Sequence, residues 1–183
     1  MSQNILIVAG HTYPQTSIAN NAIITLLKEK YPEARVDNLI ELYPDFQIDV
    51  KAEQEKLDWA DIVIIQTPLF WFSMTSMVQR WIEETFAHGW AYGSQGHALE
   101  GKKVIVGITA GAPDQKYDDG EEGISIPEIE APLKAIFPFC GMDYLGCVFT
   151  GGLLNAGADT PDVELHDHPL IKEHVAKIEQ LIG

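Results

Sequence analysis

Positive charge is scarce in this sequence. Among its 183 residues, 12 are lysine or arginine and 27 are aspartate or glutamate, so the formal net charge is −15. Arg35 and Arg80 are its only arginines. Proteins that bind nucleic acid or anionic membrane surfaces neutralise phosphate groups with clustered basic side chains. We therefore expect no nucleic-acid partner and no membrane insertion.

Cysteine and long apolar runs are scarce as well. Cys140 and Cys147 lie in the apolar stretches FPFCG and LGCVF, without Cys-x-x-Cys spacing or a His-rich neighbour, so we expect buried thiols and no metal site. No apolar run approaches the roughly 18 residues of a membrane span. The N-terminal MSQNILIVAG lacks the basic segment of a secretion signal. These absences predict a soluble, cytoplasmic protein.

The remaining composition is that of an ordinary globular protein. Hydrophobic residues make up 46%, charged residues 21% and aromatic residues 9%, which excludes disordered, collagen-like and coiled-coil chains. The length fits one core better than two. We therefore predict a single domain over residues 1–183.

Short β-branched runs alternate with helical patterns along the chain. Strands are predicted over 4–10, 34–40, 61–66, 102–110 and 142–150. Helical spacing predicts helices over 17–31, 73–86, 128–139 and 170–183, the third shortened or kinked by Pro132 and Pro138. The second strand alternates in polarity, which suits a sheet edge. The pattern predicts an α/β fold: a flavodoxin-like, doubly wound five-stranded parallel sheet of order 2-1-3-4-5, with helices on both faces.

Ligands of such sheets bind beyond the carboxyl ends of the strands, where three loops meet. The first, GHTYPQTSIAN, places hydroxyl and amide groups of Thr16, Ser17 and Asn20 at a helix N-terminus, which favours a phosphate group. Thr16 or Ser17 acting as a helix cap is an equally weighted alternative. The loop lacks G-x-G-x-x-G and the P-loop pattern, which disfavours a Rossmann dinucleotide site and an NTPase.

The second loop, QTPLFWFS, is rich in large apolar residues where a polar turn is expected. Pro68, Leu69, Phe70, Trp71 and Phe72 could offer rings and backbone N–H groups to a planar heteroaromatic ligand. That these side chains simply fill the core is the alternative.

The third loop, TAGAPDQKYDDGEEG, begins with small residues that allow a ligand to approach the backbone. It then becomes acidic around Tyr117, which suggests a mobile lid. A solvated charge run explains its acidic side chains better than a metal site does. These side chains are Asp114, Asp118, Asp119, Glu121 and Glu122.

Two further groups of residues give little support for a function. His166, Asp167, His168 and His174 lie around a polar segment before the last helix, and we interpret them as surface residues. No G-x-S-x-G elbow is present and neither cysteine has an evident base neighbour, so nucleophilic catalysis has no support.

Together, GHTYPQTSIAN, PLFWFSMTSMVQRWIEETFAHGWAYG, ALEGKKVIVGITAGAPDQKY and FCGMDYLG resemble the flavodoxin-like NAD(P)H:quinone oxidoreductases. This family includes DT-diaphorase and small bacterial quinone reductases, among them the ancillary subunit of glutathione-gated potassium efflux. The resemblance spans nearly the whole chain, and P-L-x-W-[FY] with the following helix and H-G-W-A-Y-G is its most specific part.

The resemblance implies a bound flavin that takes hydride from NAD(P)H and passes two electrons to a quinone or similar small acceptor in a ping-pong cycle. FMN fits better than FAD, because the chain lacks the C-terminal extension of FAD-binding members. Three groups of residues are implied, around the phosphate and ribityl chain, the isoalloxazine edge and the pyrimidine side respectively. They are His11, Ser17, Ile18, Ala19 and Asn20; Pro68, Leu69, Phe70 and Trp71; and Thr109, Ala110, Gly111 and Ala112.

The resemblance also implies that Tyr117 is catalytic and stabilises reduced flavin. Its histidine companion in DT-diaphorase falls at Gly123 here, and the family's T-T-G-G is replaced by residues 109–112. The aromatic residues Trp81, Phe86, Trp90 and Tyr92 predict a homodimer through the helix from Met74 to Phe86 and the turn from Gly89 to Gly93. That these rings complete the core of the monomer is the alternative. A flavodoxin-type electron carrier and a regulatory partner of a potassium-efflux transporter are the alternatives to the enzyme.

Overall fold

The computed structural model describes residues 3–118, 123–154 and 165–183. At its centre is a five-stranded sheet of order β2-β1-β3-β4-β5, in which every pairing is parallel. The strands are β1 (Ile5–Ala9), β2 (Arg35–Asn38), β3 (Ile62–Pro68), β4 (Lys103–Thr109) and β5 (Asp143–Thr150). The predicted flavodoxin-like architecture is confirmed, with the second strand at an edge.

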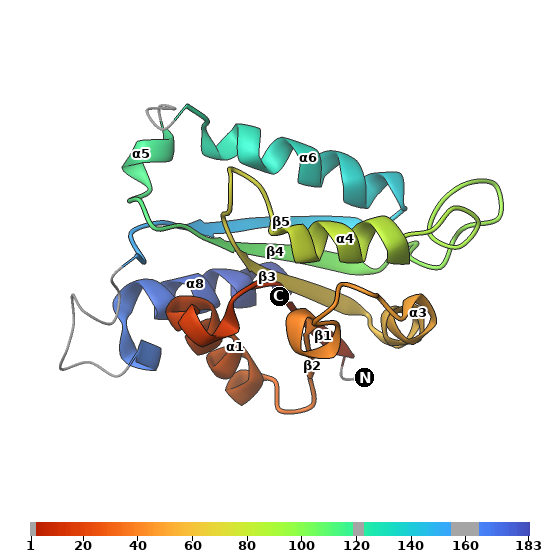
Figure 1. Ribbon diagram of the computed structural model, residues 1–183, viewed down its shortest axis with the longest axis horizontal. Helices are drawn as coiled ribbons and strands as arrows, with labels where there is room; N and C mark the ends of the chain where they lie inside the picture. Colours follow the sequence, from red (N-terminus) through yellow and green to blue (C-terminus); the bar gives the residue numbers. More distant parts are fainter. Residues whose placement is uncertain (1–2, 119–122, 155–164) are drawn as a thin grey trace.

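Helices cover both faces of this sheet (Figure 1). One face carries α1 (Ile18–Lys30) and α8 (Pro169–Ile182), and the other carries α3 (Val50–Trp59), α4 (Ser76–Thr85) and α6 (Ile126–Phe139). The short elements are η1 (Pro14–Thr16), α2 (Leu39–Leu42), α5 (Gln115–Asp118) and η2 (Leu165–Asp167).

Successive strand residues point to opposite faces and so build two apolar cores. Ile5 and Ile7 of β1 face α1 and α8, whereas Leu6 and Val8 face α3, α4 and α6. Because both faces of β1, β3 and β4 are buried, these strands are almost continuously apolar.

Three local predictions are corrected. The second strand ends at Asn38, and the chain continues into α2, where a strand to Ile40 was expected. The helix α3 was not predicted; Asp49 caps it by accepting a hydrogen bond from the Ala52 N–H at 3.1 Å. The helix α6 runs on through Pro132 and Pro138 to Phe139 and is not shortened.

The two cysteines differ in burial. Cys140 is buried as expected, whereas Cys147 on the edge strand β5 is only half-buried. Burial raises the pKa of Cys147 to about 12, so its thiol stays protonated at neutral pH. Within the described residues, no helix has both the length and the apolar character needed to span a bilayer.

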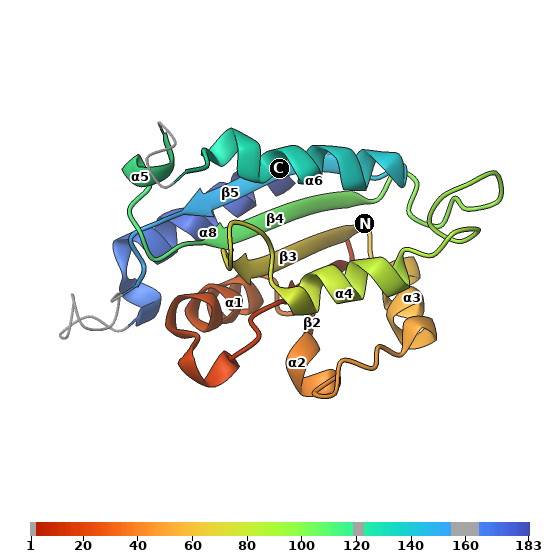
Figure 2. The same ribbon diagram turned by 45° about the horizontal axis from the view of Figure 1, so that its top comes forward.

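The carboxyl ends of the central strands meet at one end of the molecule. Figure 2 shows β3, β4 and β5 running toward the end at which α5 lies, with α1 beside them. The three loops singled out in the sequence follow β1, β3 and β4, so the parallel sheet brings them to this end.

Candidate functional site

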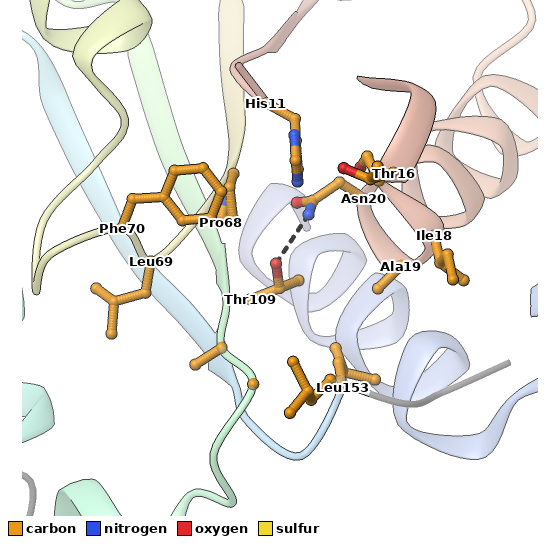
Figure 3. A pocket seen from close by; sticks show the side chains of 14 residues that line it. His11, Thr16, Ile18, Ala19, Asn20, Pro68, Leu69, Phe70, Thr109 and Leu153 are labelled. Atoms are coloured by element: carbon orange, nitrogen blue, oxygen red, sulfur yellow. Dashed lines mark hydrogen bonds between the residues drawn. The ribbon is translucent and has the colours of Figure 1, made fainter. Parts of the chain in front are cut away.

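A groove with a volume of about 160 Å³ opens where the first, second and third loops meet. Figure 3 shows side chains from α1, from the loop after β3 and from the end of β4 converging on it. All of the predicted cofactor-binding residues line it except Trp71 and Ala112. The lining residues are His11, Thr16, Ser17, Ile18, Ala19, Asn20, Pro68, Leu69, Phe70, Thr109, Ala110, Gly111, Leu153 and Leu154.

The start of α1 forms one wall of this groove. Neither hydroxyl of the first loop caps the helix: Thr16 Oγ1 donates to the Tyr13 carbonyl at 3.0 Å, and Ser17 makes no capping bond. The capping alternative is therefore wrong. Ser17 Oγ is buried and has no hydrogen-bond partner among the described residues, a costly state for a hydroxyl group. Together with the unpaired N–H groups of the first helical turn, it suits an anion such as a phosphate.

Asn20 and Thr109 connect α1 to the end of β4 at the floor of the groove. Asn20 Nδ2 donates to Thr109 Oγ1 at 2.9 Å, the bond drawn in Figure 3. The Thr109 carbonyl accepts from the Leu69 N–H at 2.7 Å, which joins the second loop to the third. The three loops are thus fixed to one another by hydrogen bonds that meet at the buried Thr109.

Close packing at Gly10 holds the first loop against α4. A Cβ atom at this position would come within 2.1 Å of Val78 Cγ2, so only glycine fits. The Gly10 carbonyl accepts a hydrogen bond from the hydroxyl of Thr75, the residue that caps α4. Thr75 Oγ1 also accepts a hydrogen bond from the Val78 N–H at 3.4 Å, which is the capping bond of α4.

His11 is a neutral ring at the edge of the groove. Its Nδ1 accepts a hydrogen bond from the Tyr13 N–H at 2.9 Å, and burial lowers its pKa. The ring meets Phe70 edge-on, with centroids 5.4 Å apart. His11 therefore offers a neutral Nε2–H to the groove and carries no positive charge at pH 7.

Trp71 does not reach the groove. It is 94% exposed, and both Trp71 and Phe72 adopt left-handed backbone angles, with φ of 51° and 61°. Such angles are strained for large side chains and are typical of functional loops. The alternative in which these two rings fill the core is wrong. With Tyr13 and Phe70, Trp71 borders a second hollow of about 580 Å³, next to the groove.

The remaining predicted residues of the third loop turn inward. Ala112 packs against the core on the α6 side, and Tyr117 on α5 is buried, with its ring edge-on to Phe149 at 5.0 Å. The expectation of an exposed lid is therefore wrong for Tyr117. Asp114 accepts a hydrogen bond from the Gly151 N–H, so it is not merely solvated, whereas Asp118 is exposed. Asp119, Glu121 and Glu122 lie outside the described residues.

The aromatic argument for a homodimer is wrong in part. Trp81 is completely buried and Phe86 is 6% exposed, and their rings meet edge-on at 5.7 Å in the core of the α4 face. Trp90 and Tyr92 are half-buried against the same core. Trp81 and Phe86 therefore belong to the core of the monomer, whereas Trp90 and Tyr92 are only partly covered by it.

The surface interpretation of the histidines is also wrong in part. His166 and Asp167 are exposed, but His168 and His174 are buried. His174 stands on α8 in the same helical stripe as Ile171, Val175 and Ile178, a spacing that could have identified it as core-facing. Among the residues placed by the structure, no group of three or more His, Cys, Asp or Glu side chains is arranged to hold a metal ion.

His174 leads back to the groove through a residue that the sequence analysis did not identify. His174 Nε2 lies 3.0 Å from Gln66 Oε1, and Gln66 Nε2 donates to Asn20 Oδ1 at 3.0 Å. At its other side, His174 Nδ1 lies 2.9 Å from Thr150 Oγ1. Burial lowers the pKa of His174 to about 3, so the ring is neutral.

Comparison with known proteins agrees with the fold described above. The profile of a protein family described as "Flavodoxin-like fold" matches residues 3–173. The chain belongs to this family. It is 39% identical over 142 residues to the glutathione-regulated potassium-efflux system ancillary protein KefF of Enterobacter sp. (strain 638), covering 77% of this chain and 79% of that protein.

Two solved structures of the flavodoxin-like fold are also similar. General stress protein 14 of Treponema denticola in complex with FMN is 27% identical, with a TM-score of 0.84 over 97% of this chain and 99% of that one. An NADPH-quinone reductase from P. pentosaceus is 22% identical, with a TM-score of 0.77 over 96% of this chain and 97% of that one. The second likeness is one of fold.

Proposed function

We propose that this chain is a cytoplasmic flavoprotein that binds FMN and transfers hydride from NAD(P)H to a quinone or similar small acceptor. The observation that carries the proposal is Ser17 Oγ, which is buried without a partner among the described residues, beside the N-terminus of α1. The FMN complex of a similar protein and the resemblance to quinone oxidoreductases support the identity of the ligand.

The residues of the groove fit such a ligand without a lysine or arginine. Ser17 and the N–H groups of Ile18, Ala19 and Asn20 would hold the phosphate, because the helix dipole and a free donor both favour an anion. Pro68, Leu69 and Phe70 would contact one side of the ring system, and Thr109, Ala110 and Gly111 the other. Bound flavin supplies the hydride chemistry itself.

The chain's own residues bind, orient and exclude water. The neutral ring of His11 covers the groove beside Phe70 without bringing a competing charge. Leu153 and Leu154 add apolar surface on the opposite side. The hollow bordered by Tyr13, Phe70 and Trp71 is the place for the nicotinamide and the acceptor, which would use it in turn, as a ping-pong cycle requires.

Absorption titrations test this function. Purified chain should bind FMN and bind riboflavin at least about tenfold more weakly, since riboflavin lacks the phosphate expected at Ser17. NADH or NADPH should then bleach the bound flavin anaerobically, and a quinone should restore its colour. Failure to bind either flavin contradicts the proposal. Binding without direct bleaching identifies a flavodoxin-type carrier.

A homodimer remains part of the proposal, on a different surface from the one first expected. Trp71 at 94%, Tyr13 at 60% and Phe72 at 44% exposure form an aromatic patch beside the groove. Removing such a patch from water favours contact with a second copy. Light scattering should show a dimer at micromolar concentration and a shift to monomer in Trp71→Ala. A flavin-loaded monomer of the unmodified chain contradicts this.

A second candidate function is favoured by the 39% identity to an ancillary protein of a potassium-efflux system. The chain would then bind a transporter in addition to acting on small acceptors. Co-purification with a detergent-solubilised potassium-efflux transporter of the same organism tests this. Absence of binding in both the oxidised and the reduced state contradicts the ancillary role and leaves the reductase proposal untouched.

A further inference from the structure

Five buried polar side chains form a continuous hydrogen-bonded line beneath the groove. They come from five elements: Thr150 of β5, His174 of α8, Gln66 of β3, Asn20 of α1 and Thr109 of β4. None is more than 5% exposed. The sequence separations along the line reach 108 residues, so only the folded sheet brings it together.

The line has a direction. The Asn20 amide donates to Thr109 Oγ1 while its oxygen accepts from Gln66 Nε2, which leaves Gln66 Oε1 facing His174. That oxygen can only accept, so His174 Nε2 carries the ring hydrogen. Because the buried ring is neutral, its Nδ1 accepts from the Thr150 hydroxyl. Every donor along the line therefore points toward Thr109.

The reverse direction would satisfy the same five groups. Both amides would be turned round, His174 would carry its hydrogen on Nδ1, and the Thr109 hydroxyl would donate to Asn20. Mixed directions place two donors or two acceptors face to face, so the five residues reverse together or not at all. The tautomer of His174 thus decides whether Thr109 offers a hydrogen or only a lone pair to the groove.

The sheet leaves room for this line at one glycine. Gly107 pairs with Gln66 across β3 and β4, and a Cβ atom there would lie 2.1 Å from Gln66 Oε1 and 2.7 Å from His174 Nε2. A glycine inside a strand forgoes side-chain packing and marks a close approach of other groups. Here the close approach is the bond between Gln66 and His174.

We propose that Gln66 and His174 are positioning residues that fix the Thr109 hydroxyl as a hydrogen-bond donor to an acceptor atom of the bound ligand. The identity of this ligand rests on the proposed function. If the ligand is FMN, the acceptor is a carbonyl oxygen or a nitrogen of its ring system. Asn20, which the resemblance associates with the phosphate and ribityl side, then acts through its side chain on the ring side as well.

Nitrogen NMR of histidine-labelled, ligand-free protein measures the direction itself. We expect His174 to be protonated on Nε2 alone and to keep this tautomer from about pH 8 to about pH 5. Its signals are assigned by their loss in His174→Gln. A ring protonated on Nδ1 overturns the inference. This result does not depend on flavin binding, so it separates the inference from the proposed function.

A double-mutant cycle measures the consequence for the ligand. Thr109→Val removes the hydroxyl and should weaken FMN binding about tenfold, and Thr109→Ser should recover most of the loss. Gln66→Glu keeps the shape, but its ionised carboxylate cannot donate to Asn20, so the Asn20 amide turns round and Thr109 must donate to it. We expect a similar loss, and no further loss when Gln66→Glu and Thr109→Val are combined. Losses that multiply would show that the introduced carboxylate acts by its charge alone and would overturn the inference.

Discussion

Two clusters of buried polar side chains lie on opposite faces of the sheet, and they differ in charge and in how they end. On the α3 and α4 face, Glu53 is completely buried and accepts hydrogen bonds from Tyr43 at 2.6 Å and Trp81 at 2.7 Å. Lys56 contacts Glu53 at 2.6 Å and Asp37 at 2.8 Å. Each oxygen of Glu53 thus has a partner within the cluster.

On the α1 and α8 face, the line from Thr150 to Thr109 contains no charged group and ends at the groove. The charged cluster, by contrast, closes on itself. A closed cluster has nothing left to offer a ligand, and breaking it leaves buried charge. An open neutral line costs less to maintain and presents one group to whatever binds at its end. We therefore infer that the charged cluster serves stability and the neutral line serves binding.

The largest effect is expected in the charged cluster. Burial opposes the charge on Lys56, but its hydrogen bonds to Asp37 and Glu53 raise its pKa overall. Lys56→Met leaves these two acidic groups without a cation and should lower the free energy of unfolding by about 3 kcal/mol in urea titrations. FMN affinity of the folded protein should not change. A loss of FMN affinity in this variant would break the division between the two clusters.

The control for this variant is Lys51→Met. Lys51 lies on the same helix and pairs with Glu55 at 3.9 Å, but both side chains are exposed. Exposed pairs contribute little, so the change should stay within about 0.5 kcal/mol. Equal losses in the two lysine variants would show that loss of a helix lysine, and not the buried cluster, is responsible.

The neutral line should make the fold sensitive to acid. His174 has a usual pKa of 6.5 when unfolded, and burial lowers its pKa to about 3 in the folded chain, with a further contribution from Lys177. Between these values the unfolded chain binds a proton that the folded chain does not. The stability due to neutral His174 is therefore complete above pH 6.5 and is lost as the pH falls toward 3.

The measurement is the difference in unfolding free energy between the unmodified chain and His174→Gln. Relative to His174→Gln, the unmodified chain should lose about 2 kcal/mol of unfolding free energy when the pH falls from about 7 to about 5. The exposed His166 gives the control, because His166→Gln removes a histidine that lies outside the buried line. A difference that is independent of pH would contradict a neutral buried ring.

A substitution in the groove should change the affinity for FMN and not the free energy of unfolding. Ser17→Ala removes a hydroxyl that has no partner among the described residues of the ligand-free chain, so the free energy of unfolding without FMN should not fall. FMN affinity should fall about tenfold, or roughly 1.4 kcal/mol, because a hydrogen bond to a charged phosphate is lost. Thr25→Val on the exposed side of α1 is the control. Unchanged FMN affinity in Ser17→Ala would remove the phosphate from this position.

Much of the fold could be predicted because its signals are local. The runs around Val8, Ile64 and Val106 are apolar at almost every position, as strands buried on both faces must be, and the spacing of Met77, Val78 and Trp81 indicates α4. The helix α3 was missed because its segment VKAEQEKLDW is mostly polar. Its cap at Asp49 was the available signal.

The residues of the site likewise include some that could be predicted and some that could not. Loop positions next to the strand ends could be predicted, since a parallel sheet brings those ends together. The position of the Trp71 side chain could not be predicted, because its direction depends on left-handed backbone angles that no local sequence pattern encodes. The spacing of His174 in α8 indicated a core position but not its partners, and Gln66 gave no signal, since a buried polar residue acquires its role from partners up to 108 residues away.

The smallest effect is expected at Tyr117, which we propose to assist flavin reduction. Its ring is buried against Phe149 on the face opposite the neutral line, and Tyr117→Phe preserves that ring and its packing. With Gly123 in the place of the companion histidine, the tyrosine–histidine pair of the family is absent, and the Tyr117 hydroxyl can donate one hydrogen bond. Stopped-flow reduction by NADH should therefore slow about threefold, well below the loss of an essential donor. Tyr31→Phe, the same chemical change next to the far end of α1, should leave the rate unchanged. An unchanged rate in Tyr117→Phe as well would assign Tyr117 to packing alone, and the polar contribution to catalysis would then come from the neutral line.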